Sequence, residues 1–322
     1  MKKALAWLAG AALLALATPA SAQQLPNRPI RIVVPFEAGG AMDIIMRVVS
    51  KQVTDKGGPQ IVVENKTGAG GAIGVMAVKD ADPDGLTLVQ VSSSTHVLNP
   101  HTSNIPYDPV KDFQPIVMLV KVPTILAVPA SSPAKTFAEF VQYAKTKPDG
   151  LTYGSAGVGS APHITGALLE KSLGVRMTHV PYRGMAGAMT DLIGGRIDFV
   201  YSSIPSIGGA AADGQIRLLA VAGKDHISAY PQLPSMKDVG HPDVDVDLWF
   251  GVMAPAGTAA ATVQALNEVF AKATNAPELT ERFKQLGVEI ATGSPAQFKQ
   301  ADRKSTRLNS SHMSESRMPS SA

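Results

Sequence analysis

The residues best suited to chemistry in this chain are glycines and hydroxyl-bearing side chains that follow apolar strands. The first such stretch, Val33 to Asp43, reads VVPFEAGGAMD: an apolar strand, a Gly-Gly turn and a helical pattern. Glycines let the main chain approach a ligand closely, and the first N–H groups of a helix have no partner inside that helix. A carboxylate or phosphate supplies the missing acceptors and gains from the helix dipole. An ordinary tight turn explains the same glycines.

Two further segments repeat this arrangement. Ser92 to Thr95 follow the strand expected over 86–91, and their hydroxyls are placed to donate to an anion or to cap a helix. Ser155 to Ser160 read SAGVGS between an expected strand and an expected helix. Asp43 lies where a carboxylate caps or complements a helix start, and a direct ligand role is the alternative. Asp198 falls inside the strand expected over 196–201, where an acid needs a buried hydrogen-bonding partner, either near a cleft or within the structure.

The sequence predicts no cofactor and no metal. The glycines at 68, 70 and 74 miss the dinucleotide-binding fingerprint by one residue. His96 lacks metal-ligand spacing to another His, Cys or Asp, so we expect a structural or solvent-facing histidine. The nucleophile motif G-x-S-x-G is absent. A serine, histidine and aspartate triad is recognised by geometry, however, so a hydrolase using a loop serine stays open.

The elements that would position these residues indicate an α/β protein of two domains. Apolar residues recur at helical spacing over 41–56, and expected strands and helices alternate along most of the chain. The extended passage over 116–128 contains Pro123 and is too long for one strand, so we expect two strands with a domain crossing near 120–123. The strand expected over 246–255 would be the return crossing.

Composition and the amino terminus indicate export. Two lysines precede an apolar run over 4–17 and small residues up to Ala22, the pattern of a secretory signal. We expect cleavage after Ala22, because the run is shorter than the roughly 20 residues of a membrane span. The chain has no cysteine, which excludes a lipid-anchor cysteine and disulfides and suits a bacterial periplasm. The body over 23–300 has a net charge of −1 despite the pI near 9.0, so no nucleic-acid partner is expected.

Seven collinear motifs resemble the Bug family, the periplasmic substrate-binding components of tripartite tricarboxylate transporters. The resemblance covers about 26–298. The motifs are VVPFEAGGAMD, VVENKTGAGGAIG, ADPDGLTLVQVSSSTHVLNP, IPYDPVKDFQPI, LTYGSAGVGSAPH, HVPYRGMAGAMTDLIGGRIDFVYSSIPS and WFGVMAPAGT.

This resemblance implies a two-lobed type II periplasmic binding protein fold with a hinge and an interlobe cleft. A small carboxylate would bind in the cleft, chiefly through main-chain amides and water, for delivery to membrane permease subunits. We expect a signal peptide over 1–22, a first lobe over 23–121 plus 225–300, a second lobe over 122–224 and a disordered tail over 301–322 that is foreign to the native chain. The protein would be a monomer and not an enzyme.

Site residues carried over from the family come from both lobes. Those of the first lobe are Phe36, Ala38, Gly39, Gly40, Ala41, Ser92, Ser93, Ser94 and Thr95. Those of the second are Ser155, Ala156, Ser160, Tyr182 and Asp198. Glu37 departs from the family, which usually has Pro-Pro or Ala-Gly at this point. If its carboxylate points into the cleft, it favours a ligand with an amine or a second polar group. Alternative functions are an exported serine hydrolase and a ligand-sensing subunit of a signalling system.

Overall fold

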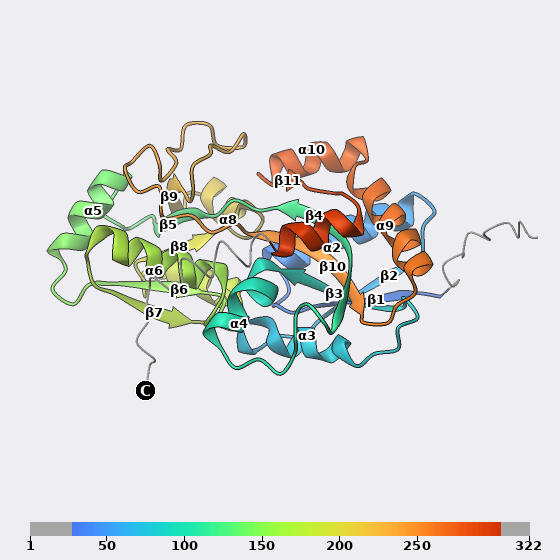
Figure 1. The fold of residues 1–322 in the computed structure, drawn as a ribbon. Helices are drawn as coiled ribbons and strands as arrows, with labels where there is room; N and C mark the ends of the chain where they lie inside the picture. Colours follow the sequence, from blue (N-terminus) through green and yellow to red (C-terminus); the bar gives the residue numbers. More distant parts are fainter. Residues whose placement is uncertain (1–27, 304–322) are drawn as a thin grey trace, which may run out of the picture.

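The computed structural model describes residues 28–303 (Figure 1). The expected signal peptide over 1–22 lies outside the described residues, and so does the expected tail apart from residues 301–303. Among the described helices, none combines the length and the apolar character needed to cross a membrane.

The first lobe is built on a six-stranded sheet. Its strands are β1 (Ile30–Val34), β2 (Ile61–Asn65), β3 (Thr87–Ser92), β4 (Phe113–Lys121), β10 (Trp249–Pro255) and β11 (Glu289–Ile290). Their order is β11-β4-β10-β3-β1-β2, with β1 parallel to β2 and β3 and the other pairs antiparallel. The helical segments of this lobe are α2 (Ala41–Asp55), η1 (Ala69–Gly71), α3 (Ala72–Lys79), η2 (Ser94–Leu98), α4 (Asn99–Thr102), α9 (Ala260–Thr274), α10 (Pro277–Gln285) and a helix over 295–303.

The second lobe is built on a five-stranded sheet. Its strands are β5 (Ile125–Pro129), β6 (Leu151–Ser155), β7 (Met177–Pro181), β8 (Phe199–Ser202) and β9 (Ile216–Val221), in the order β7-β6-β8-β5-β9. Its helices are α5 (Phe137–Thr146), α6 (Ala161–Leu173), α7 (Met185–Ile193) and α8 (Ile204–Ala212). β6 is parallel to β7 and β8, so the carboxyl ends of β6 and β8 lie at one edge of the sheet.

The chain crosses between the lobes where the sequence predicts it. β4 ends at Lys121 in the first sheet and β5 begins at Ile125 in the second, so the long apolar passage is two strands separated by Pro123. The return crossing joins β9 to β10 through residues 222–248. Most of the second passage lies over the second lobe in Figure 1, and its last part runs across to β10. The two-lobed fold is therefore confirmed.

Local sequence explains how α2 is placed. Met42, Ile45, Met46, Val49 and Val53 are all buried, so one apolar face packs on the sheet. Gly40 caps the helix start in an extended conformation without a side-chain hydrogen bond. The amino terminus of α2 therefore keeps its unpaired N–H groups.

Two expectations need correction. Asp198 does not lie inside a strand, because β8 begins at Phe199. Residues 301–303 are not disordered, because they continue the helix that starts at 295, and Asp302 is buried. This helix is attached by Phe298, whose ring packs edge-on against Trp249 with 5.3 Å between centroids. This apolar contact of Phe298, which precedes the serine-rich segment, stabilises the helix beyond Gln300.

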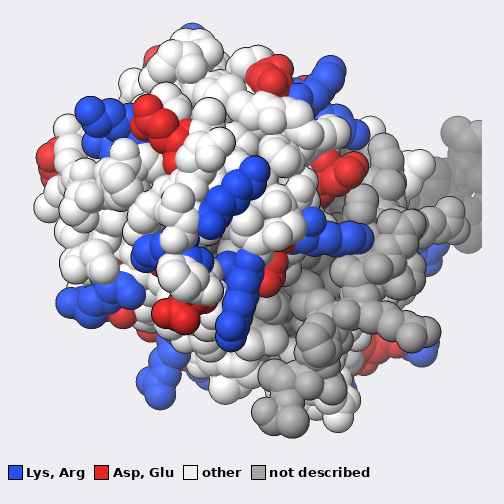
Figure 2. Space-filling model, turned by 90° about the vertical axis from the view of Figure 1, so that its left-hand side faces the viewer, with Lys and Arg blue, Asp and Glu red and all other residues white. Residues whose placement is uncertain are grey.

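Charges of both signs are interspersed on the face of the second lobe shown in Figure 2, with no continuous basic patch in that view. A nucleic-acid-binding face concentrates lysine and arginine. The visible face therefore lacks that signature.

Candidate functional site

A pocket with an empty volume of about 560 Å³ lies between the two lobes. This volume includes space that is open to solvent. The first lobe and the two crossings contribute Phe36, Glu37, Gly40, Ala41, Met42, Ser92, Ser94, Thr124, Leu248 and Phe250. The second lobe contributes Ala156, Ser160, Pro162, Met185, Ser202, Ser203 and Ser206.

Four helices begin at this pocket. Its lining includes Ala41 and Met42 of α2, Pro162 of α6, Met185 of α7 and Ser203 at the start of α8. No hydrogen bond joins the N–H groups of Ala41 and Met42 to another described residue. Four positive helix ends and unpaired amides form an environment that favours an anion.

Two buried hydroxyl groups in the lining have no hydrogen-bonding partner among the described residues. They are Thr124 Oγ1, in the crossing between β4 and β5, and Ser206 Oγ, in the first turn of α8. An unsatisfied buried polar group costs about 1–3 kcal/mol. Both residues line the same pocket as the helix ends, so a polar ligand that reached these hydroxyl groups would satisfy them.

The remainder of the lining is mainly apolar, with one charged side chain. Phe36, Met42, Met185, Leu248 and Phe250 supply apolar surface. No lysine, arginine or histidine of the described chain belongs to the lining, and Glu37 is its single ionisable residue. An acid bound here would be held by amides and hydroxyls, and its body would contact carbon.

The lobes touch each other around the pocket. The Ala161 N–H at the start of α6 donates to Ser94 Oγ in the first lobe at 2.9 Å. Gly70 packs so closely on the second lobe that a β-carbon there would stand 2.5 Å from the Val158 carbonyl oxygen. The structure is therefore a closed form, in which Ser94 satisfies the amide of α6.

Half of the predicted site residues line the pocket and half do not. Phe36, Gly40, Ala41, Ser92, Ser94, Ala156 and Ser160 line it, whereas Ala38, Gly39, Ser93, Thr95, Ser155, Tyr182 and Asp198 do not. The Gly39 N–H donates to Asp43 Oδ2 at 3.0 Å, so this amide is already engaged. Thr95 Oγ1 accepts a hydrogen bond from the Ser92 N–H at 3.0 Å, which makes it a local structural group.

Asp43 stabilises the turn beside the pocket. Burial raises the pKa of its carboxyl group, but hydrogen bonds from Arg47, Gly39 and Asn65 outweigh burial and leave the pKa below its usual value. Asp43 stays ionised and organises Gly39 from within the first lobe. The structure thus supports the structural interpretation of this acid.

Tyr182 and Ser155 face away from the lining. The Tyr182 hydroxyl contacts Asp191 Oδ2, and the ring borders a separate surface hollow. Ser155 is fully buried, and its Oγ lies 2.6 Å from His179 Nε2. His179 stacks on His163 with 4.0 Å between ring centroids. Burial lowers the pKa of His179 to about 3, helped by His163, and burial lowers that of His163 to about 4. Both rings are neutral near pH 7.

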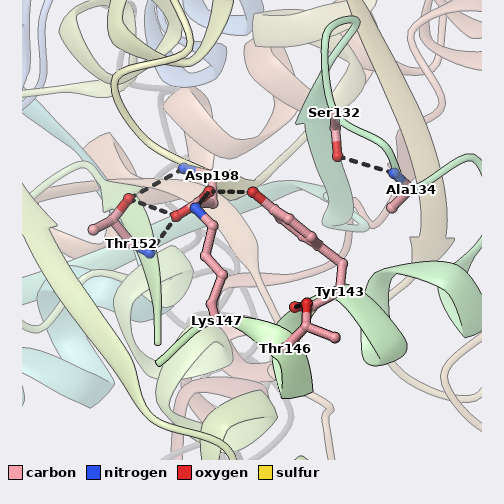
Figure 3. Close-up of polar contacts among 7 residues, drawn as sticks. All are labelled: Ser132, Ala134, Tyr143, Thr146, Lys147, Thr152 and Asp198. Carbon is pink, nitrogen blue, oxygen red and sulfur yellow. Dashed lines mark hydrogen bonds and ion pairs between the residues drawn. The ribbon is translucent and has the colours of Figure 1, made fainter. Parts of the chain in front are cut away.

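Asp198 belongs to a polar cluster at the opposite end of β8 from the pocket (Figure 3). Its Oδ2 accepts hydrogen bonds from the Thr152 N–H at 2.8 Å and the Thr152 hydroxyl at 3.0 Å. Its Oδ1 lies 2.6 Å from Lys147 Nζ, and the Tyr143 hydroxyl completes the set at 3.5 Å. These contacts join α5, β6 and β8 within the second lobe.

Replacing Asp198 with asparagine should therefore destabilise the protein and leave ligand affinity unchanged. The loss of a charge-assisted hydrogen bond to Lys147 should lower the free energy of unfolding by about 2 kcal/mol. Chemical denaturation measures the first effect and calorimetric titration the second. A fall in affinity at unchanged stability would return Asp198 to the binding site.

Sequence reasoning left several lining residues out of the predicted set. Ser202, Ser203 and Ser206 follow the carboxyl end of β8, the same signal that selected Ser92 and Ser94. α8 was not expected, although Ser203 followed by Pro205 is a helix-start signal. Thr124, Met185, Leu248 and Phe250 carry no local signal, because tertiary packing brings them to the pocket.

His96 is a structural residue, one of the two expected roles, and it does not face solvent. The ring is buried in η2 and packs edge-on against Phe113 with 5.4 Å between centroids. Burial lowers its pKa to about 3. No group of three or more metal-binding side chains occurs within the described part of the chain.

Comparison with known proteins places this geometry among receptors of one transport system. Residues 45–310 match the sequence model of the family described as the tripartite tricarboxylate transporter family receptor. A UPF0065 protein of Pseudomonas sp. strain P51 is 37% identical over 292 residues, covering 89% of this chain and 87% of the relative.

Solved structures agree with this result. The periplasmic binding protein BugD has a TM-score of 0.86 at 30% identity, covering 90% of this chain and 98% of BugD. Rpa4515 of R. palustris, solved with adipate, has a TM-score of 0.87 at 29% identity, covering 90% of this chain and 98% of that protein. Both likenesses extend over the two lobes.

Proposed function

Because the chain belongs to the tripartite tricarboxylate transporter receptor family, we propose that its interlobe pocket captures a small organic acid for delivery to the membrane permease of such a transporter. The family is one of periplasmic solute-binding proteins, BugD among them. An exported chain cleaved after Ala22, acting as a monomer, fits this role. The cleavage site itself lies outside the described residues.

The observation that supports this function most strongly is the set of polar groups left without partners at the pocket. The amides of Ala41 and Met42 lack acceptors among the described residues, and the hydroxyls of Thr124 and Ser206 are buried without partners. A carboxylate oxygen accepts from both kinds of donor. Hydrogen bonds to a charged group contribute about 1.5–3 kcal/mol each, so a few are enough for micromolar affinity.

Binding would be coupled to hinge motion. The ligand's contacts to α2 and α8 coexist when the lobes are closed, so binding shifts the population toward the closed form that a permease would recognise. We propose a hinge at 122–124 and in the return crossing. Met236 and Val244 pack in the core of the second sheet, so the second lobe would extend beyond 224 to about 246.

A serine hydrolase is the alternative with an observation in its favour, the contact between Ser155 Oγ and His179 Nε2. Two features oppose it. Ser155 is fully buried outside the pocket lining, and its hydroxyl also contacts the Gly157 carbonyl oxygen at 3.0 Å. No aspartate or glutamate is bonded to the His179 ring among the described residues, so the third member of a triad is missing there. We therefore propose a binding protein without enzymatic activity.

A ligand-sensing subunit of a signalling system would use the same pocket. Ligand binding would produce the same closed form whether the membrane partner is a permease or a signalling protein. Membership of a transporter receptor family supports the transport function. Deletion of the gene tests it, because a transport receptor is required for uptake of the bound acid whereas a sensor is required for a response to it.

A thermal-shift panel tests the binding function. Mono-, di- and tricarboxylates and amino acids are each added to the purified protein, together with the uncharged amides of the same compounds. A bound acid at 100 times its Kd stabilises the folded state by about 2.7 kcal/mol and should raise Tm by several degrees, whereas its amide should not. Turnover of an ester without a shift by any acid would support the hydrolase instead.

A further inference from the structure

Glu37 is the charged side chain of the pocket, and its position follows from the contacts of both lobes. It lies three residues before Gly40, in the turn that leads into α2, and belongs to the pocket lining. Its side chain reaches the second lobe, because a β-carbon on Gly184 would stand 2.9 Å from Glu37 Oε2 and 3.0 Å from its Cβ. The carboxylate is therefore held at the pocket, facing the start of α7.

No cation of the described chain neutralises this carboxylate. Glu37 forms no ion pair and no side-chain hydrogen bond with another described residue, whereas the nearby Asp43 is paired with Arg47 at 2.9 Å. The other lining residues carry no formal charge. The amino end of α7 offers partial positive charge, which does not cancel a full negative charge.

A negative group fixed in the pocket acts in opposite ways on two kinds of acid. A second carboxylate on the ligand would lie near Glu37 in a partly dehydrated pocket and would be repelled. An ammonium group would form a charge-assisted hydrogen bond with Glu37, while the ligand carboxylate used the unpaired amides of α2 and the hydroxyls of Thr124 and Ser206. Specificity between the two follows from attraction and repulsion together.

From these observations we infer that Glu37 makes the pocket selective for acids that carry an ammonium group over di- and tricarboxylates. This inference rests on the proposed binding function and adds the class of ligand to it. The apolar surface of Phe36, Leu248 and Phe250 would contact the carbon skeleton that joins the two charged groups. The monocarboxylate without the amine would bind less tightly than the ammonium-bearing acid and more tightly than the diacid.

Matched ligands isolate the charge. 5-Aminopentanoate, pentanoate and adipate share a four-carbon chain attached to one carboxylate and differ at the remote end of that chain. Norleucine, hexanoate and 2-butylmalonate form a second set for the α position. Affinity is measured by calorimetric titration at pH 7 and low salt for the wild type, Glu37→Gln and Glu281→Gln. Glu281 is an exposed residue of α10 and serves as the control for loss of a glutamate charge.

The expected result has three parts. In at least one set, the wild type and Glu281→Gln bind the ammonium-bearing acid at least tenfold more tightly than the diacid. Glu37→Gln weakens the ammonium-bearing acid about tenfold to a hundredfold, the range for one charge-assisted hydrogen bond. The same variant strengthens the diacid, because the repulsion is gone.

Three results would overturn the inference. One is tighter binding of a diacid than of its ammonium-bearing match by the wild type, which is decisive even if Glu37→Gln folds poorly. Another is an unchanged preference in a folded Glu37→Gln protein. Absence of binding by every acid to every protein would reject the binding function as well, so the two failures are distinguishable. Glutamine has nearly the shape of glutamate, so the packing on Gly184 is kept and a denaturation midpoint verifies the fold.

Discussion

Replacing Ala41 with proline is expected to weaken binding of the cognate acid about tenfold to a hundredfold while leaving the fold intact. Ala41 is the first residue of α2, and its N–H has no partner among the described residues. Proline removes this donor, and the loss of one hydrogen bond to a charged acceptor costs about 1.5–3 kcal/mol. Proline is favoured at the first position of a helix. Gly40, with φ of −76° and ψ of 165°, already has a conformation that suits the residue before proline.

A matched control is available in α9. Ala260 is the first residue of that helix, away from the pocket lining, and the preceding Ala259 has an extended ψ of 139°. Ala260→Pro should bind as the wild type does. Calorimetric titration measures both affinities, and circular dichroism checks the helix content. Equal affinity of Ala41→Pro and the control would show that the α2 amide does not contact the ligand.

Acid should destabilise the protein between pH 6.5 and about 4 through three histidines, the buried His96 and the half-buried His163 and His179. Burial lowers the pKa of His96 and His179 to about 3 and that of His163 to about 4, below the value near 6.5 of the unfolded chain. The folded state therefore binds fewer protons than the unfolded state in this window. The contribution of these histidines to the free energy of unfolding is fully present above pH 6.5. Below that pH it decreases by about 1.4 kcal/mol for each unit of acidification and each such histidine.

Asp302 acts in the opposite direction. Burial raises its pKa to about 6, so its folded state binds the proton more tightly than the unfolded state does between pH 4 and 6. Its contribution is present at low pH and is lost as pH rises through 6. The expected net effect over pH 5–6 is still a loss of stability on acidification, because three histidines oppose one carboxyl group.

Single variants separate the histidine contributions. His179→Gln keeps an acceptor or donor near Ser155 Oγ, and His163→Asn keeps an acceptor for the Gly159 N–H, which donates to His163 Nδ1 at 3.1 Å. Each should reduce the slope of unfolding free energy against pH by about 1.4 kcal/mol per unit between pH 5 and 6. Urea denaturation at several pH values provides the slopes. An unchanged slope would mean that the replaced histidine titrates alike in both states.

Much of the architecture was predictable because it depends on local patterns. The spacing of the buried residues of α2 follows from the apolar pattern over 41–56, and the glycine turn before the helix follows from Val33 to Asp43. The lobe crossing followed from strand length and Pro123, and β4 and β5 lie in different sheets accordingly. The family motifs extended these local signals to the whole fold.

The pocket was predictable in part, because its contacts are set between distant segments. Gly39 looks like a free amide in the sequence, yet Asp43 accepts its hydrogen bond. Asp198 looks like a buried acid near a cleft, yet Thr152 and Lys147 hold it at the other end of β8. Thr124 and Leu248 reach the pocket through the crossings between the lobes. Most of these contacts form between segments that are distant in the sequence, so the residue types and spacing of one segment do not predict them.

Glu37 departs from the family pattern, and its position in the structure gives this departure a role in ligand binding. The sequence left two orientations open. The structure places the side chain in the pocket lining and against Gly184 of the other lobe. The charge therefore bears on ligand choice, which backbone amides alone do not determine.

The most direct test of this account is a crystal structure of the protein with the acid that gives the largest thermal shift. We predict that its carboxylate lies between the lobes, within hydrogen-bonding distance of the Ala41 or Met42 amide and of the Thr124 or Ser206 hydroxyl. A carboxylate bound outside this pocket, or held in it without contact to any of these four groups, would contradict the account.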